Sequence, residues 1–254
     1  MSALQPLVDA HAVLAMEQQL HLADVVGERD FTASLDAGTI SFGKKLTYRC
    51  ELIGTEAPES GTWLWGWANP AEFDDHITAT ARALRGHGEA QAILELSQAE
   101  VSLGDEVSGT GMAAVAVGFA PAPAYYTVPM DGDARAYLLV DGPGLELPAP
   151  EVPRLVTTLT LVLESGDVLE WPTALESYAA RRGLTAATGE DRAIRLEGPM
   201  LDGHVRVALD ELGRVAELTG SAGGHGNTVD GGATDAPPAR RGLLARLRGR
   251  DYQR

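Results

Sequence analysis

The first 25 residues place apolar side chains at the spacing of an α-helix. Residues three and four positions apart lie on one face of a helix, so this spacing predicts an amphipathic helix over residues 4–25. His11 lies near the apolar side and is interpreted as a core or boundary histidine. The polar residues that fall mostly off the apolar face are Asp9, Glu17, Gln18 and Gln19. The apolar face consists of Leu4, Leu7, Val8, Leu14, Leu22 and Val25.

Beyond this helix the apolar positions recur every second residue, which is typical of β-strands. Residues 31–42 are predicted to form two strands around an Asp-Ala-Gly turn, and residues 45–53 a third strand. A turn at residues 57–61 leads into a tryptophan-rich strand at 62–69, which Pro70 ends. These strands predict an antiparallel meander that packs against helices. The buried face of the third strand is expected to carry Leu46, Tyr48, Cys50 and Leu52.

The middle of the chain is predicted to combine helices with a hairpin. Asp74 or Asp75 can cap a helix that runs to Arg85, and Gly86 or Gly88 is expected to end it. The other predicted elements here are an apolar segment of undecided type at 90–96, a helix at 105–119, and a hairpin with strands at 125–130 and 135–140.

A domain boundary is predicted between Asp141 and Pro153. Four prolines and two glycines lie in this stretch, and both residue types interrupt helices and strands. The sequence therefore predicts an N-terminal α+β domain at 1–143 and a second, smaller α+β segment at 151–219. That segment is expected to contain an apolar run at 154–163 (helix or strand undecided), a helix at 173–183 with a Thr173/Glu176 capping box, and strands at 192–196, 204–209 and 214–218.

The chain ends in a predicted disordered, glycine-rich linker and basic tail at 220–254. Residues 220–238 hold six glycines and almost nothing apolar, which is too little apolar surface to offset the entropy of ordering. Residues 240–254 carry six arginines and one acid, whereas the net charge of the whole chain is −16. The acidic remainder disfavours nucleic acid as a partner. The tail is expected either to stay solvated or to make weak contacts with an anionic surface.

Three of the four tryptophans, Trp63, Trp65 and Trp67, occupy alternate positions in the run Thr-Trp-Leu-Trp-Gly-Trp-Ala-Asn. Side chains of a strand alternate between its faces, so the three indoles are predicted to point the same way. One interpretation is a core that covers the opening helix, because large aromatic side chains dominate core energetics. The other is an aromatic platform on which a ligand stacks. The rim of such a ligand site would consist of Asn69, Asp74 and His76.

Other candidate motifs favour structural roles. Residues 109–114 match a dinucleotide-binding fingerprint, but the segment before them is polar and acidic, which favours a small-residue helix face. Asp74-Asp75-His76 combines residue types that bind metals, but its place at a helix start favours capping. Cys50 alternates with apolar residues, which favours an inert core thiol over a nucleophile. The sequence therefore predicts no catalytic residues, no cofactor and no metal site.

Composition indicates the compartment. A single cysteine excludes an intrachain disulfide and fits a reducing cytoplasm. No apolar run approaches the roughly 20 residues needed to cross a bilayer. The first residues lack the basic and apolar regions of a signal peptide, so we expect a cytoplasmic protein.

The sequence resembles an uncharacterised bacterial family, a domain of unknown function that is frequent in high-GC Gram-positive species. The resemblance covers most of residues 5–219 and leaves the tail outside. No activity is assigned to that family, so the resemblance implies no catalytic residues. It rests above all on the run from Thr62 to Asn69, and further on Phe31, the Asp36-Ala-Gly38 turn, Phe42, Leu52 to Thr55, Tyr125-Tyr126 and the Asp210 to Arg214 hairpin.

Two function classes follow from these observations. The order of helices and strands is similar to that of secretion-chaperone-type folds, which are acidic, non-enzymatic, often dimeric proteins that hold partner segments. This similarity favours a non-catalytic protein-binding or adaptor protein, with a protein partner or a second copy of the chain. The alternative is a small-ligand-binding protein or an enzyme with a pocket beside the tryptophan strand.

Overall fold

The computed structural model describes residues 2–104, 107–120, 124–223 and 228–230. The fold is α+β, with a curled antiparallel sheet packed against helices and a second, smaller antiparallel sheet. The fold class expected from the sequence is therefore confirmed. The similarity to secretion chaperones stays a prediction.

The elements follow each other in a simple order, in which η marks a 3-10 helix. Up to residue 143 they are α1 (Gln5–Val26), β1 (Phe31–Ser34), β2 (Thr39–Phe42), β3 (Leu46–Ala57), β4 (Thr62–Trp65), η1 (Gly66–Ala68), η2 (Asp75–Thr78), α2 (Ala79–Gln91), α3 (Leu94–Ser97), β5 (Glu100–Ser102), α4 (Gly109–Phe119), β6 (Ala124–Pro129) and β7 (Arg135–Asp141). Beyond it they are α5 (Val152–Ser165), α6 (Trp171–Arg182), β8 (Thr185–Thr188), β9 (Ala193–Gly198), β10 (Leu201–Leu209), β11 (Val215–Ala222) and β12 (Thr228–Asp230).

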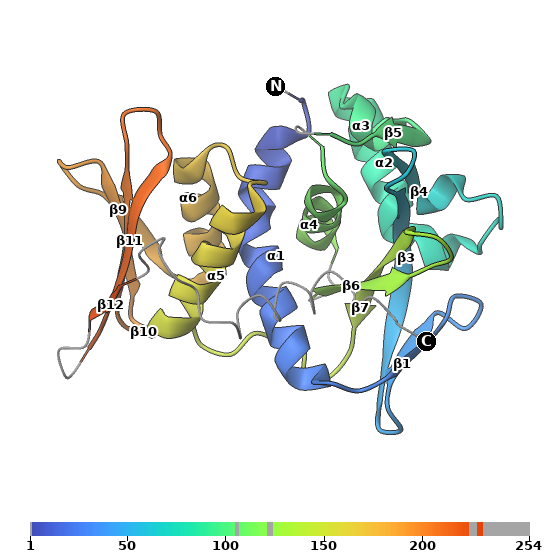
Figure 1. Cartoon of the computed structure of the whole chain (residues 1–254), viewed down its shortest axis with the longest axis horizontal. Coiled ribbons are helices and arrows are strands. Elements are labelled where there is room, and N and C mark those ends of the chain that lie inside the picture. The colour runs from blue at the N-terminus through green and yellow to red at the C-terminus, as the bar shows by residue number, and fades with distance from the viewer. Residues whose placement is uncertain (1, 105–106, 121–123, 224–227, 231–254) are drawn as a thin grey trace.

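These elements stack in four layers (Figure 1). The sheet of β1 to β7 lies on one side, followed by α1 and α4, then by α5 and α6, and finally by the sheet of β8 to β12. α1 is the central helix, because it packs against α4 and β6 on one side and against α5 and α6 on the other. The opening helix, the first hairpin and the β6–β7 hairpin form as the sequence predicts.

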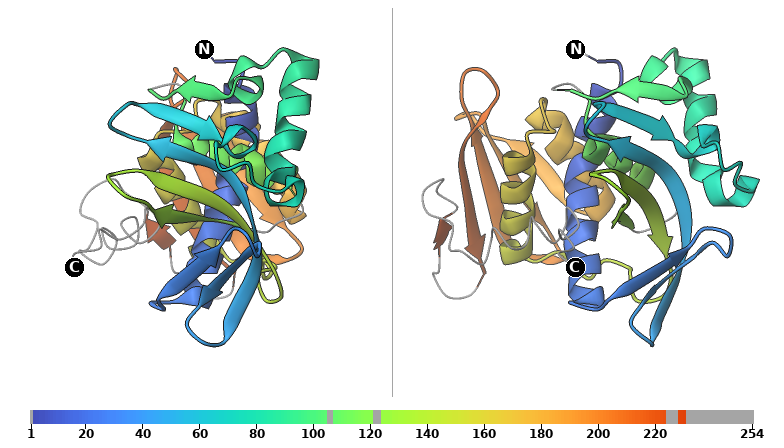
Figure 2. Two further views of the ribbon diagram at one scale, coloured as in Figure 1. Left: turned by 90° about the vertical axis from the view of Figure 1, so that its right-hand side faces the viewer. Right: turned by 45° about the vertical axis from the view of Figure 1, so that its right-hand side comes forward.

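The strand β3 organises the larger sheet. β2 and β4 pair with its two ends along one edge, and β7 pairs along the other edge. The β3–β7 register shifts between Leu52 and Gly54, which leaves Ile53 as an extra residue. An extra residue bends a strand and reverses the faces that the following side chains meet. Leu52 and Ile53 are consequently both buried, in different hydrophobic clusters, and the sheet is curled (Figure 2).

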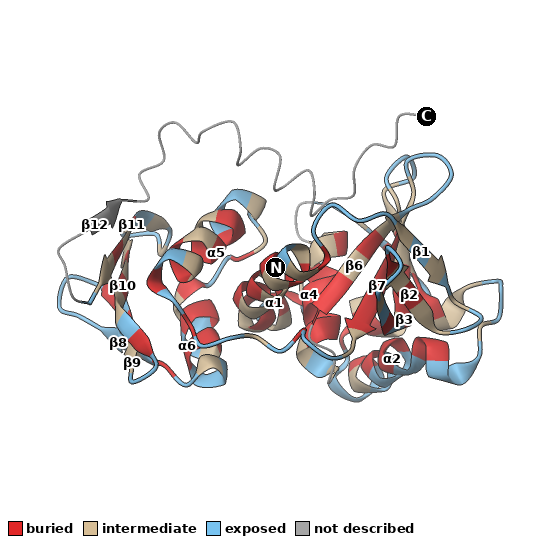
Figure 3. Ribbon diagram, turned by 90° about the horizontal axis from the view of Figure 1, so that it is seen from below, coloured by how far each residue is buried: buried red, intermediate tan, exposed pale blue. Residues whose placement is uncertain are grey.

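Two hydrophobic clusters fill the molecule. The larger one runs from Trp63 and Trp65 through α4 and α1 to α5, α6 and the second sheet. Buried positions accordingly extend from β6 and β7 across α4 and α1 to α5 and α6 (Figure 3). The smaller one lies between the β1–β2 hairpin, β3, β6 and β7, and receives Leu22 and Val26 from the end of α1. α1 therefore belongs to both halves of the molecule.

The end of α2 corrects the sequence prediction. The helix passes through Gly86 and Gly88 and ends before Ala92, which has a left-handed φ of 55°. A Cβ atom at Gly88 would lie 2.6 Å from the Cβ atom of Leu96. Gly88 thus serves the close approach of α3 to α2, and does not end the helix.

The starts of α4 and α6 also differ from the predictions. α4 begins after Ser108, whose hydroxyl accepts a hydrogen bond from the Gly111 amide at 2.9 Å. Residues 107 and 108 are not helical, and residues 105–106 lie outside the described residues. α6 begins at Trp171, so Thr173 lies inside the helix and the predicted capping box is wrong. Proline in the first turn suits this earlier start, since its missing N–H has no helical partner there.

The second sheet has more strands than the sequence predicts. β8 was not predicted, and the apolar run with undecided structure is the helix α5. β11 continues to Ala222 and pairs with β12, so the expected linker does not begin at Gly220. A Cβ atom at Gly220 would lie 2.7 Å from Val152, so this glycine allows α5 to pack on the sheet. The basic tail and the rest of the expected linker lie outside the described residues.

Cys50 lies on the buried face of β3, as its alternation predicts, and is 4% exposed. Burial, and then the neighbouring charge of Glu51, raises the pKa of its thiol to about 11. Because the thiolate is the reactive form, we expect iodoacetamide to label the folded protein slowly at pH 7.5 and the denatured protein fast. Mass measurement along a labelling time course checks this. Complete labelling of the native protein within minutes would show that the thiol is reactive.

Candidate functional site

The helix α1 carries an unusual share of buried polar side chains. Nine polar residues are buried in the described part of the chain, and five of them belong to α1. Buried polar groups need hydrogen-bond partners, because an unpaired one costs about 1–3 kcal/mol. The partners of these side chains therefore indicate what α1 is built to contact. The five residues are Gln5, Asp9, His11, Glu17 and Gln19.

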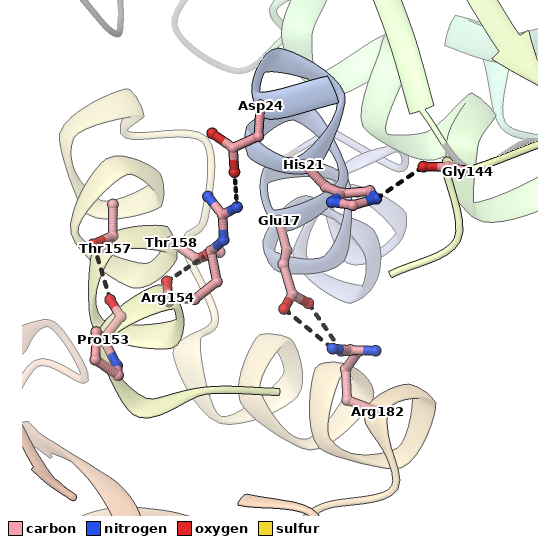
Figure 4. A network of polar contacts seen from close by, with 9 residues as sticks. All are labelled: Glu17, His21, Asp24, Gly144, Pro153, Arg154, Thr157, Thr158 and Arg182. Atoms are coloured by element: carbon pink, nitrogen blue, oxygen red, sulfur yellow. Dashed lines mark hydrogen bonds and ion pairs between the residues drawn. The ribbon is translucent and has the colours of Figure 1, made fainter. Parts of the chain in front are cut away.

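Glu17 is the centre of the contact between α1 and α6. The Glu17 side chain is 3% exposed, and the guanidinium of Arg182, 11% exposed, places its Nε 2.9 Å from Glu17 Oε2. Arg182 Nη2 donates to Glu17 Oε1 at 3.3 Å, and the Tyr178 hydroxyl donates to Glu17 Oε2 at 2.9 Å. Burial and the nearby carboxylate raise the pKa of Tyr178 above its ordinary value, so its hydroxyl remains a donor. Figure 4 shows the paired carboxylate and guanidinium.

A second polar contact lies near the start of α1. Asp9, 1% exposed, accepts hydrogen bonds from the Gln5 side chain at 3.0 Å and from the backbone amide of Leu169 at 2.8 Å. The side-chain amide of Gln5 also donates to the backbone carbonyl of Asp167 at 2.8 Å. Ser177 of α6 donates to the carbonyl of Ala10 at 2.7 Å. The same face of α1 thus holds both the α5–α6 connection and α6 itself.

Further contacts surround this face and reach the connection between the halves (Figure 4). Arg154 of α5 forms an ion pair with Asp24 of α1. A ring nitrogen of His21 lies 3.3 Å from the carbonyl of Gly144, and Arg182 donates to the carbonyl of Pro148 at 2.6 Å. We call the surface of α1 formed by Gln5, Asp9, Ala10, Glu17 and Asp24 the α1 interface.

The tryptophan run does not form one continuous strand. Trp63 and Trp65 lie in β4 with no exposed surface, and their rings meet edge to face at 5.5 Å. Trp67 lies in η1 and is half-buried, under the guanidinium of Arg85 at 4.5 Å from the ring centroid. The prediction that three indoles share a strand face is therefore wrong for Trp67. The chain turns at Gly66, where a Cβ atom would lie 2.4 Å from the carbonyl oxygen of Leu52.

The predicted rim residues lie on the surface beyond this turn. Asn69 is half-buried and accepts a hydrogen bond from the Ala71 amide, and Asp74 and His76 are exposed. The structure does not bring Trp63 and Trp65 to the surface beside them, because both indoles belong to the core. A ligand-binding role of Trp67, Asn69, Asp74 and His76 stays a prediction.

The fingerprint at residues 109–114 forms the start of α4. The strand before it, β5, is antiparallel to β4, so the parallel strand of a dinucleotide fold is missing from this position. Asp167 accepts hydrogen bonds from the hydroxyls of Ser108 at 2.7 Å and Thr110 at 3.0 Å. A carboxylate of the chain itself thus lies at the helix end that would bind a phosphate.

His11 is buried against α4, with 7% of its surface exposed and its ring 6.1 Å from Phe119. Its Nδ1 has no hydrogen-bond partner among the described residues. Burial, and then the positive charge of Arg181, lowers the pKa of His11 to about 4. Protonation therefore favours the unfolded chain, and folding stability is lost as the pH falls from about 6.5 toward 4.

We expect the free energy of unfolding to fall by about 1 kcal/mol more in the native protein than in His11→Gln between pH 7.5 and 5.5. Urea denaturation at both values checks this expectation, and exposed His76→Gln serves as the matched control. Equal pH dependence of the native protein and His11→Gln would rule out the neutral, buried histidine.

No three histidine, cysteine, aspartate or glutamate side chains of the described residues form a group that could hold a metal ion. No helix in the described ranges is long and apolar enough to cross a membrane.

The fold is thus α+β, with a central helix α1 whose polar side chains contact α6 and the connection before it. Comparison with protein families places residues 5–143 in a family of unknown function, DUF6882. The chain belongs to this family, which confirms the expected membership in an uncharacterised family. The matched region runs from α1 to β7 and excludes α5, α6 and the second sheet. No curated protein and no solved structure matches the chain.

Proposed function

We propose that this chain is a non-catalytic, cytoplasmic protein-binding or adaptor protein, and that the α1 interface binds its partner. The observation that supports the proposal is the polar character of this surface. Glu17 meets α6 through hydrogen bonds and an ion pair, and Asp9 accepts a hydrogen bond from the connection before α6; such contacts are how recognition surfaces gain specificity. A purely structural contact between helices needs no buried carboxylate.

The charge of the family region supports a basic partner. Residues 5–143 contain 20 acidic and seven basic residues. Opposite charge attracts a partner over a distance and raises its rate of association. The guanidinium of Arg182 on Glu17 is an example of the cationic group that such a surface accepts.

Site-specific photocross-linking in the native cells tests the proposal. A benzophenone amino acid replaces His21, which is half-exposed at the edge of the α1 interface. The control position is Arg195, which is exposed on β9 between the buried residues Ile194 and Leu196. We expect a discrete protein adduct from position 21 and none from position 195. No adduct from position 21 in the folded protein would refute the proposal.

The alternative function is a small-ligand-binding protein or an enzyme that uses Trp67, Asn69, Asp74 and His76. Its support is the half-exposed indole beside polar surface groups. Arg85 already covers one face of that indole, which leaves less of the ring for stacking. Iodide quenching of the tryptophan fluorescence tests this alternative. Quenching would show that the Trp67 indole is accessible to a ligand, whereas full protection would count against the alternative.

A further inference from the structure

The two side chains of α6 that contact Glu17 have a defined spacing along the helix. Tyr178 and Arg182 are four residues apart, so they lie one above the other on one face of the helix. Both groups contact the same carboxylate: the hydroxyl donates a hydrogen bond at 2.9 Å, and the guanidinium donates from Nη2 at 3.3 Å and places its Nε at an ion-pair distance of 2.9 Å. One helical face thus supplies both groups that the buried Glu17 requires.

We infer that Glu17 is the centre of a recognition site for a helix with tyrosine and arginine four residues apart, and that α6 occupies this site from within the chain. This inference rests on the proposed function and names its partner class. The partner also needs apolar residues one and two turns earlier, because Ala174, Leu175 and Trp171 of α6 are buried with Tyr178 in the larger cluster.

The buried charge makes the site selective. A helix without a cation would leave the Glu17 carboxylate unpaired in a site where little water reaches it. Such an uncompensated buried charge is strongly unfavourable, so apolar helices are rejected even when their shape fits. A lysine in place of Arg182 would keep the charge but lose the planar, multiple donors of the guanidinium.

The arrangement also allows α6 to leave. The described strands of the two sheets pair only within their own sheet, so separation of the halves breaks no β-ladder. The chain crosses between the halves through residues 142–151. This segment contacts α1 through Gly144 and His21, and α6 through Pro148 and Arg182. An incoming helix can replace α6 if it supplies the same hydrogen bonds and apolar contacts.

A synthetic peptide with the sequence of residues 169–184 tests the inference, with the full chain as the receptor. We expect fluorescence anisotropy to detect its binding. A matched peptide with Tyr178→Phe and Arg182→Met should bind at least about tenfold more weakly, which corresponds to about 1.4 kcal/mol. Equal binding of the two peptides would overturn the inference.

Variants of the full chain test the occupancy by α6. Arg182→Lys weakens the internal helix, so this chain should bind the unaltered peptide more tightly than the native chain does. Arg195→Lys, which changes an exposed ion pair, is the matched control and should leave the affinity unchanged. Both chains are tested at up to about 1 mM peptide, which is a typical effective concentration of a tethered segment. If neither the native chain nor Arg182→Lys binds the peptide at that concentration, the inference is overturned.

Hydrogen exchange provides a readout that needs no substitution. We expect the amides of α6 in the native chain to exchange faster than those of the central strand β3, because α6 detaches while the sheet stays folded. Exchange of both at the rate of global unfolding would overturn the occupancy by a detachable helix. Peptide binding without a cellular cross-link would retain the site and refute the proposed function alone.

Discussion

Replacement of Trp65 by alanine is expected to lower the free energy of unfolding by about 3–5 kcal/mol. The indole has no exposed surface and packs edge to face against Trp63. Its Nε1 donates to the carbonyl of Glu95 at 2.9 Å, so the substitution also leaves that acceptor without this donor. Urea denaturation followed by circular dichroism measures the loss.

Trp67→Ala is the matched control for this substitution. Trp67 is half-buried in η1, so its truncation should cost markedly less than that of Trp65. A loss below about 1 kcal/mol for Trp65→Ala would place the Trp65 indole outside the core and support the interpretation of a ligand platform.

Replacement of Arg182 by methionine is expected to cost about 3–5 kcal/mol, because it leaves the Glu17 carboxylate buried without its cation. Methionine keeps much of the side-chain volume, so the effect reports the lost charge more than lost packing. The loss should fall mainly on α6 and its neighbours. Chemical denaturation, together with hydrogen exchange resolved by segment, measures both the size and the place of the loss.

The double variant Glu17→Gln with Arg182→Met removes both charges and should recover part of this stability. Arg195→Met, in an exposed pair with Glu197, is the surface control and should change stability by no more than about 1 kcal/mol. If the double variant is less stable than Arg182→Met alone, the ion pair is not the cause of the loss.

Local pattern predicted α1 but not its surroundings. Asp9, Glu17 and Gln19 fall off the apolar face of the helix, and all three are buried. The reason lies more than 100 residues away, since their partners come from Leu169, Tyr178, Arg182 and Tyr125. The helix and its boundaries are local properties and could be predicted. The α1 interface depends on which distant helix covers it, and the spacing of residues within α1 does not predict the identity of that helix.

The tryptophan run shows the same limit on a smaller scale. Alternation predicted correctly that Trp63 and Trp65 share a strand face, because the period of two holds within β4. It failed at Trp67, where close approach of Gly66 to β3 turns the chain into η1. The sequence pattern does not reveal the extra residue Ile53 in β3 either, since a bulge inserts a buried residue without changing the apolar character of the strand.

The long separation of Glu17 from Tyr178, 161 residues, also affects the protein during synthesis. The ribosome releases α1 and the whole seven-stranded sheet before α6 exists, and domains tend to fold as they emerge. The α1 interface then faces water for several seconds at typical rates of about 5–20 residues per second. A wholly apolar face would be prone to aggregate in that interval, whereas this face combines its apolar residues with the charges of Asp9, Glu17 and Asp24, which favour water. These charges therefore lower the tendency of the nascent chain to aggregate before its own helix, or another one, covers α1.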